Sequence, residues 1–329
     1  MSFFEHASSS GPLIDVPSDL TDFFGRHSRF IIVGHLEPDA DCIGSEVALA
    51  LALQRIGKSV QTANPGPFER QEIASWGEQF VTDPEHLDDR ATGAIVVDCS
   101  SPDRIRPFNS ALDHCELAVI DHHQTGSDFG DIRFVRSDVP ANTILIAALI
   151  DELLGSLTPE EAQPLFLGLA TDTGFFRFLE AYSPLAFEAA ARLSRSGASP
   201  REAAAHLNSG RSWGSRRIIG RMLERAEQLQ DGAVLMTYMT REDELTFGTR
   251  RDSDALNHLL LSIEGVRAIA VVKEKDSGCT LSFRANDETD VSQLAALFGG
   301  GGHQKASGAF SSQSLSNLLP IVRSRLQEI

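Results

Sequence analysis

The chain has 329 residues, of which 42% are hydrophobic, and contains four cysteines and 26 glycines. This composition is typical of a globular protein with two domains of ordinary size, and it excludes a disulfide scaffold and a disordered chain. Apolar runs such as residues 30–33 and 94–97 are far shorter than the ~20 residues of a membrane helix. Because the N-terminus also lacks the basic and apolar segments of a signal peptide, we expect a cytoplasmic protein without membrane contact.

Negative charge is concentrated in the first part of the chain. In total, 29 basic residues oppose 46 acidic residues, which gives a net charge of −17. Residues 1–195 contain 13 basic and 30 acidic residues, residues 196–230 contain six and three, and residues 231–329 contain ten and 13. Two interpretations stay open: the carboxylates surround bound cations, which would attract phosphates, or they form a solubilising acidic surface.

Three short runs rich in isoleucine and valine predict buried parallel strands. The first run is followed by a predicted helix over residues 41–56, so that strand, helix and strand form a βαβ unit. Ligands bind beyond the carboxyl ends of the strands in sheets of this type. We therefore expect His35, Asp98 and Asp121 to converge at one sheet edge. The runs cover residues 29–35, 93–100 and 117–123.

The second half of the chain predicts helices first and then a second sheet. Residues 159–170 predict a helix with Thr158 as its N-cap, and residues 184–196 predict another. After a break rich in Gly, Ser and Pro, an arginine-rich helix is predicted over residues 213–230. Strands are predicted at residues 233–240, 266–275 and 278–286, around a helix at 253–262. The expected fold is α/β in two domains, with a parallel-sheet domain at residues 1–195, a helical linker at 196–230 and a smaller α/β domain at 231–329.

Six potential metal ligands come from four separate segments. Taken singly, each has another explanation, since Asp41 would suit a helix cap and a lone histidine is more often structural. Their predicted arrival at one sheet edge favours a metal site, and six ligands suffice for two ions ~3.5–4 Å apart, the usual arrangement for phosphate-ester hydrolysis. Imidazole combined with carboxylates favours Mn²⁺ or a similar transition ion. The six residues are His35, Asp39, Asp41, Asp98, His122 and Asp172.

Four segments of the first half resemble, in order and spacing, the motifs of the DHH phosphoesterase superfamily. They read GHLEPDADCIGS at residues 34–45, VVDCS at 96–100, IDHHQTG at 120–126 and ATDTGFF at 170–176. The stretch SFRANDETDVSQLAALFGGGGHQKASGA at residues 282–309 resembles the glycine-rich signature of the DHH-associated C-terminal domain. The chain is similar in length to the stand-alone nanoRNases of the NrnA type, which also dephosphorylate 3′-phosphoadenosine 5′-phosphate (pAp).

The resemblance implies a role for each ligand and places the active site in a cleft between the two domains. A water shared by the two ions would lose its proton near neutral pH and attack phosphorus. His123 would lie beside the scissile phosphate as a hydrogen-bond donor or proton relay, and Asp121 would orient a histidine. The ligands of one Mn²⁺ would be His35 and Asp39, those of the other Asp41, His122 and Asp172, with Asp98 as the bridge.

Substrate contacts are expected in both domains. Consecutive glycines let the backbone approach an anion closely, and Arg284 and His303 flank that run. Arg104 could reach the phosphate or be a solvated surface residue, and Asn142 is expected to contact the phosphate. Ile146 stands where many relatives carry a glutamate, which puts in doubt any contact borrowed at that position. The glycines concerned are Gly300, Gly301 and Gly302.

The resemblance implies an Mn²⁺-dependent hydrolase that converts oligoribonucleotides of two to five nucleotides, including pApA, to 5′-mononucleotides and pAp to AMP. Mg²⁺, Co²⁺ or Fe²⁺ could replace Mn²⁺, and relatives suggest a homodimer. Three alternatives stay open: a pyrophosphatase or exopolyphosphatase, a cyclic-dinucleotide phosphodiesterase on the same metal centre, and a nucleotide-binding module without catalysis. Short RNA and nucleotides are the expected partners.

Overall fold

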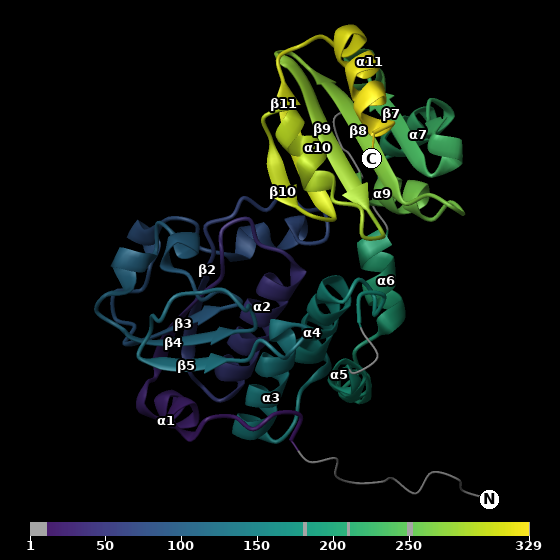
Figure 1. Cartoon of the computed structure of the whole chain (residues 1–329). Coiled ribbons are helices and arrows are strands. Elements are labelled where there is room, and N and C mark those ends of the chain that lie inside the picture. The colour runs from purple at the N-terminus through teal and green to yellow at the C-terminus, as the bar shows by residue number, and fades with distance from the viewer. Residues whose placement is uncertain (1–11, 180–182, 209–210, 249–252, 329) are drawn as a thin grey trace, which may run out of the picture. The chain divides into compact units, whose positions relative to one another are not determined.

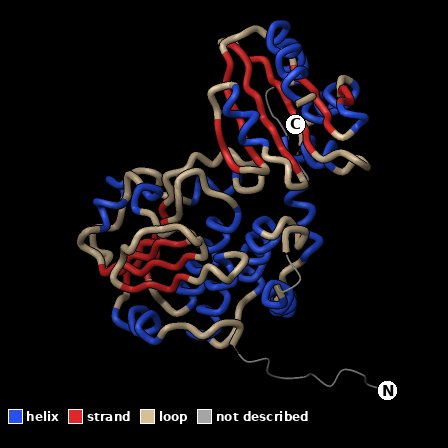
Figure 2. Tube along the Cα trace, in the orientation of Figure 1, coloured by secondary structure: helices blue, strands red, loops and turns tan. Residues whose placement is uncertain are grey.

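The computed structural model describes residues 12–179, 183–208, 211–248 and 253–328, and the chain divides into two units, residues 1–209 and 210–329. The first unit contains a five-stranded parallel sheet in the order β2-β1-β3-β4-β5 (Figures 1 and 2). Its strands are β1 (Arg29–Val33), β2 (Ser59–Ala63), β3 (Gly93–Val97), β4 (Glu116–Asp121) and β5 (Ile132–Val135). Its α-helices are α1 (Ser18–Arg26), α2 (Ala40–Arg55), α3 (Asn142–Leu154), α4 (Pro159–Asp172), α5 (Pro184–Arg195) and α6 (Pro200–Asn208).

Both faces of this sheet are buried, which is why its central strands are continuous apolar runs. In β1, Phe30 and Ile32 pack into a core shared with α2, α3 and α4. The alternate residues Ile31 and Val33 pack on the other face, against the short 3₁₀ segments between β3 and β4. The side chains of β1 therefore alternate between two buried cores, and not between one core and solvent.

The strand order explains where a ligand site forms. From β1 the chain passes through α2 to β2 on one side, and β3 then pairs with β1 on its other side. The connections leaving β1 and β3 therefore diverge, and this opens a crevice at the carboxyl ends of these two strands. His35 follows β1 and Asp98 follows β3, so both lie at this switch point.

The second unit contains a six-stranded mixed sheet in the order β10-β11-β9-β8-β7-β6. Helices α10 and α11 share a core with one face, and α7 and α9 share a core with the other. Its strands are β6 (Glu227–Leu229), β7 (Val234–Met239), β8 (Ala268–Lys275), β9 (Gly278–Ala285), β10 (Gly301–His303) and β11 (Ala306–Ser311). Its α-helices are α7 (Trp213–Glu224), α8 (Arg241–Phe247), α9 (Ser253–Leu261), α10 (Val291–Leu297) and α11 (Leu315–Leu326).

The α/β class and the parallel first sheet confirm the prediction, as do the three predicted strands of each sheet. One predicted helix, residues 213–230, is wrong in length, because α7 ends at Glu224 and residues 227–229 form β6 against β7. The expected linker 196–230 is divided between the units, since α6 belongs to the first and α7 contributes core residues to the second. Within the described residues, none of the helices has both the length and the hydrophobicity to cross a bilayer.

Candidate metal centre

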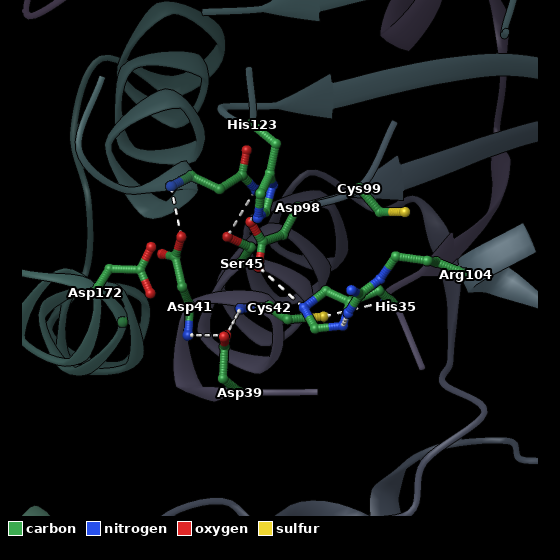
Figure 3. Close-up of polar contacts among 12 residues, drawn as sticks. His35, Asp39, Asp41, Cys42, Ser45, Asp98, Cys99, Arg104, His123 and Asp172 are labelled. Atoms are coloured by element: carbon green, nitrogen blue, oxygen red, sulfur yellow. Dashed lines mark hydrogen bonds and ion pairs between the residues drawn. The ribbon is translucent and has the colours of Figure 1, made fainter. Parts of the chain in front are cut away.

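Asp98 lies at the centre of the site, directly after β3 (Figure 3). Its φ of 57° is uncommon for a residue with a side chain. Its backbone N–H donates to the carbonyl of Ile120 in β4 (2.9 Å), and the residue is 1% exposed. Nε2 of His35 lies 3.3 Å from one carboxylate oxygen of Asp98, and Nε2 of His122 lies 3.3 Å from the other. The turn after β3 therefore holds one buried carboxylate between two histidines.

The hydrogen bonds of these histidines show that a cation fits between them and Asp98. Nδ1 of His35 lies 2.9 Å from the carbonyl of Leu36, and Nδ1 of His122 lies 3.1 Å from that of Val139. Carbonyls only accept, so Nδ1 of His122 carries a proton, and its Nε2 either holds a second proton or binds a cation. For His35, the guanidinium of Arg104, a donor, also lies 2.8 Å from Nδ1. The 3.3 Å separations exceed the ~2.7–2.9 Å of a charge-assisted hydrogen bond, and neither oxygen of Asp98 has a hydrogen-bond partner among the described residues. This donor set fits a divalent metal ion.

Asp41, His122 and Asp172 form a second group, in which one potential ligand atom of each lies within 4.8 Å of the others. Nε2 of His122 is 3.3 Å from Oδ2 of Asp172 and 3.7 Å from Oδ2 of Asp41. Asp41 is fully buried and accepts from the backbone N–H groups of Asn142 (2.6 Å) and Thr143 (2.9 Å). The N-terminus of α3 thus fixes Asp41, as helix N-termini do for anions, while Asp172 ends α4.

Burial and like charges make the two carboxyls of this second group hard to ionise without a cation. Burial, followed by repulsion from Asp98, raises the pKa of Asp41 to about 7. Burial, followed by repulsion from Asp41 and Asp98, raises the pKa of Asp172 to about 9. Burial opposes the charge of His122, but its contacts with Asp98 and Asp41 prevail and raise its pKa to about 10. A bound divalent ion would displace these protons.

The metal-free protein should therefore lose stability as pH rises from 6 to 9. Asp41, Asp172 and His122 all have folded-state pKa values above their unfolded values, so the stability they contribute is present at low pH and lost as pH rises through about 7 to 10. We expect the Tm of EDTA-treated protein to fall by at least ~3 °C over this range. Saturating Mn²⁺ should raise Tm more at pH 9 than at pH 6, because fewer protons must be displaced.

Differential scanning calorimetry with and without Mn²⁺ checks this result. Asp172→Asn is the matched variant, since it removes the carboxyl whose pKa is raised by burial and like charges to about 9, and it should flatten the pH dependence of the metal-free protein. A Tm of the metal-free protein that rises between pH 6 and 9 would contradict the electrostatic description.

Asp39 is the N-cap of α2. Its Oδ1 accepts from the backbone N–H groups of Asp41 (3.0 Å) and Cys42 (3.1 Å). The alternative that Asp41 caps this helix is therefore wrong, and Oδ2 of Asp39 is the oxygen left for an ion. In the described part of the chain, Sγ of Cys42 lies within 4.8 Å of potential ligand atoms of His35 and Asp98, and metal binding by Asp39 stays a prediction.

Asp121 orients His123. The Asp121 Oδ1 atom lies 2.8 Å from Nδ1 of His123 and accepts from the backbone N–H of His122 (2.8 Å) and of His123 (3.2 Å). This hydrogen bond raises the pKa of His123. The His123 side chain is 51% exposed, whereas Asp121 is fully buried. Asp121 can therefore act only through the histidine that it holds.

Arg104 and Asn142, both expected to contact phosphate, have different positions. Arg104 is exposed, and its Nη2 lies 2.8 Å from Nδ1 of His35 and donates to the carbonyl of Leu36 (3.2 Å). Asn142 is fully buried against Ser45 (3.0 Å). With its amide turned, its oxygen accepts from the backbone N–H of Asp98 (3.2 Å). Asn142 therefore supports the strained turn and is out of reach of a substrate, which corrects the expected phosphate contact.

Ile146, the position at which a glutamate was expected, is fully buried in the core of the first unit. A buried carboxyl occurs instead at Glu46 in α2, which sequence reasoning did not identify. Its Oε2 accepts from Asn64 (2.9 Å), and burial raises its pKa well above the ordinary value. A Cβ at Gly34 would lie 2.4 Å from that oxygen, so only glycine fits before His35. The one signal in the sequence was a glutamate within the otherwise apolar helix α2.

The glycine run lies at the edge of the second sheet. Gly300 and Gly302 are required by packing, since a Cβ on either would lie within 2.6 Å of β11 backbone. Gly301 has open space around it and no positive φ, so packing in the described structure does not require it. In the register, His303 pairs with Ala306, which pairs with Arg284. Directly paired residues share a face, so the His303 and Arg284 side chains project on the same side.

Comparisons with known proteins agree with this architecture. Residues 29–169 match the N-terminal domain of the DHH family, and residues 231–328 match the DHHA1 domain. The chain is 31% identical over 281 residues to the "Bifunctional oligoribonuclease and PAP phosphatase NrnA" of Thermus thermophilus, an alignment that covers 84% of this chain and 82% of that protein. It is 24% identical to the Bacillus subtilis protein of the same name, over 89% and 92% of the two chains.

Two solved structures share the fold. The crystal structure of an exopolyphosphatase-related protein from Bacteroides fragilis has a TM-score of 0.79 at 22% identity and covers 94% of each chain. The crystal structure of exonuclease RecJ bound to manganese has a TM-score of 0.51 at 17% identity and covers 96% of this chain and 95% of that one. Because both domain models match in order and a 31% identical relative aligns over most of both chains, this chain belongs to the DHH family.

Proposed function

We propose that this chain is a metal-dependent phosphoesterase that cleaves oligoribonucleotides of two to five nucleotides into 5′-mononucleotides and removes the 3′-phosphate of pAp. The observation that carries the proposal is the buried Asp98 carboxylate shared by His35 and His122, with Asp41 and Asp172 beside it. The names of the relatives from Thermus and Bacillus support this choice of substrates. The expected native metal is Mn²⁺, and the protein is expected to act in the cytoplasm.

Residues of the first unit would perform the chemistry in distinct roles. Bound divalent ions would supply Lewis-acid polarisation of the phosphoryl oxygens and a nucleophilic water near neutral pH. Asp98 would tie the two ligand groups together, since each histidine contacts a different oxygen of its carboxylate. His123, held by Asp121, would donate a hydrogen bond or a proton to a phosphoester oxygen. Because half of its side chain is exposed, the substrate could reach it.

The second unit would bind the far end of the substrate. Arg284 and His303 share a face of the sheet, and Gly301 offers backbone without a side chain next to them. The Arg284 guanidinium donates to the carbonyl of Phe283 (2.9 Å), which directs it along the strand. A cation, an imidazole and an accessible backbone N–H are suited to a terminal phosphate.

Hydrolysis of defined substrates tests the proposal. Protein stripped with EDTA and reloaded with Mn²⁺ is incubated with pApA, a labelled ribo-pentamer, a 24-mer, pAp and pyrophosphate. We expect mononucleotides from pApA and the pentamer, AMP from pAp, and slow or no loss of the 24-mer. Preferential release of phosphate from pyrophosphate would replace the proposal with a phosphoanhydride hydrolase. No turnover of any substrate would leave nucleotide binding without catalysis.

Replacing His123 should separate proton transfer from metal binding. We expect His123→Ala to lower kcat on pApA by ~10²–10⁴-fold, the usual contribution of a positioned acid or base. The bound metal, measured by atomic emission, should stay within error of the unchanged protein, because the group of Asp41, His122 and Asp172 does not include His123. One ring nitrogen of His123 does lie within 4.8 Å of potential ligand atoms of Asp98 and His122, so the metal content decides whether it is a ligand. His114→Ala is the matched control, a histidine of the first unit whose contact with Cys115 lies outside the metal centre. Loss of metal with His123→Ala would instead make His123 a ligand.

A further inference from the structure

Helix α7 carries one continuous polar face that the proposed chemistry does not use. The face follows helical spacing i, i+3, i+4, i+7, i+8 and i+11, and it lines a groove of about 330 Å³. The opposite face, with Ile218, Ile219 and Met222, packs into the core of the second unit beside β7 (Figure 1). We call the exposed face the α7 groove. Its lining residues are Trp213, Arg216, Arg217, Gly220, Arg221 and Glu224.

Trp213 is held at the rim of the α7 groove with 76% of its surface exposed. Its neighbour Gly214 packs so tightly that a Cβ there would lie 1.8 Å from the carbonyl oxygen of Phe247. The start of α7 is therefore fixed on the end of α8, and the indole has no place in the core. An exposed indole presents a flat apolar surface of the kind that stacks on a base.

The arginines of the α7 groove are partly pre-positioned. The Arg217 guanidinium lies over the Phe247 ring, 4.8 Å from its centroid, which is cation–π geometry. Arg221 lies 3.6 Å from Glu224, a long contact between two exposed groups that contributes little. Three arginines and one glutamate face the groove, whereas the whole second unit has 15 basic and 15 acidic residues and the first unit has 14 and 31. The groove is thus a basic site on an acidic protein.

Gly220 leaves the backbone of α7 uncovered on this face. It lies in the middle of α7, where glycine costs about 1 kcal/mol relative to alanine. It has no positive φ, and a Cβ added to it would meet no atom within 4 Å. Packing in the described structure therefore does not require a glycine at this position. Its absence of a side chain leaves the helix backbone open between Arg216 and Arg221.

We infer that the α7 groove binds single-stranded RNA, with a base stacked on Trp213 and backbone phosphates paired with Arg217 and Arg221. Trp213 and Arg221 are eight residues apart, ~12 Å along the helix, so they would contact different nucleotides. Tryptophan and arginine also occur at protein interfaces, but the centre of such an interface is apolar, whereas this face has a single large apolar side chain beside four charged ones. The choice of RNA rests on the proposed function, but binding here needs no metal.

Trp213 itself reports on this site, because the chain has only two tryptophans. In Trp76→Phe protein Trp213 is the sole indole, and Trp76 belongs to the first unit, where it stacks on His206. A 12-nucleotide oligo(A) RNA is titrated in EDTA, so that no hydrolysis occurs. We expect quenching of Trp213 fluorescence and an affinity that falls with salt. Inorganic polyphosphate of equal phosphate concentration should cause much less quenching, since it has no bases to stack.

Charge removal then tests the phosphate contacts. In the same background, Arg217→Gln with Arg221→Ala should weaken RNA binding at least tenfold and reduce the salt slope by ~1.4, about 0.7 for each lost contact with a single strand. Arg325→Ala, which removes an exposed arginine of α11 that pairs with Glu328, is the matched control and should bind as the parent does. Both proteins should hydrolyse pApA at the parent rate, and their Tm values show whether they are folded.

Three outcomes would overturn the inference. They are the absence of Trp213 quenching by RNA, equal RNA affinity of the double variant and the parent, and equal quenching by polyphosphate. A double variant that changes its sedimentation coefficient with unchanged RNA affinity would assign the groove to contact between copies of the chain. Failure of the proposed function has a different signature, because the unchanged protein would then leave pApA intact whatever the RNA titration shows.

Discussion

Asp98→Asn should lower kcat on pApA by at least ~10³-fold, because the amide can neither balance the charge of two cations nor join the two ligand groups. The bound metal should fall from two ions per chain to one or none. Burial opposes the charge of Asp98, but its contacts with His122 and His35 prevail and lower its pKa to about 2, so in the unchanged protein it is ionised throughout the physiological range. Only its replacement, and not a pH change above 4, should remove this charge.

Asp138→Asn is the matched control for this result. Asp138 belongs to the same unit and is also an ion-paired aspartate, but it is 65% exposed and bonded to Arg136. Exposed pairs contribute ~0–1 kcal/mol, so this variant should keep full activity and both ions. Metal content is measured by atomic emission, and folding by circular dichroism. If Asp98→Asn retains more than a tenth of the activity, Asp98 does not bridge the two groups.

Gly168→Ala should produce the second large effect, by disturbing the contact between α4 and α2. A Cβ at Gly168 would lie 2.6 Å from Cγ2 of Thr143, 2.8 Å from Cα of Asp41 and 2.9 Å from its Oδ1. All three atoms are buried, so the helices would have to separate and move Asp172 away from Asp41. We expect a loss of ~1–3 kcal/mol of stability, a Tm lower by ~2–10 °C, and metal affinity weakened at least tenfold.

A loss of stability in Gly168→Ala would identify the steric contact as its cause, because alanine is otherwise more favourable than glycine in a helix by about 1 kcal/mol. Gly25→Ala in α1 is the control, since a Cβ there meets no atom within 4 Å, and it should leave stability unchanged or raise it by ~0.5–1 kcal/mol. Thermal denaturation and Mn²⁺ titration measure both variants. Equal Tm values for the two variants would show that the contact at Gly168 is easily relaxed.

The central strands were predictable because both of their faces are buried. Edge strands were not, since they have one neighbouring strand and carry polar residues. The β2 sequence SVQTA and the β5 sequence IRFV are partly exposed along their length. The C-terminal limit of α7 was missed for a related reason: nothing local stops the helix before β7 pairs with residues 227–229.

The geometry of the loop after β1 and one long-range contact explain the other differences at the metal centre. The loop after β1 closes on α2. This makes Asp39 the N-cap of that helix and brings Cys42 next to His35 and Asp98. Asn142 looked like a phosphate ligand because it is a polar residue near the motif. Its burial against Ser45 depends on α3 packing on α2, which involves residues almost a hundred positions apart.

By itself, the sequence determined the α/β class, the three central strands of the first sheet and the residue types available to bind metal, because apolar periodicity and ligand chemistry are local properties. Only the tertiary structure decided that β1 and β3 are neighbours at the switch point, that Asp98 contacts two histidines at once, and that Asp121 holds His123. These depend on strand order and on side chains brought together from distant segments. Spacing along the chain does not encode such distances, since loops of any length can join the same two strands.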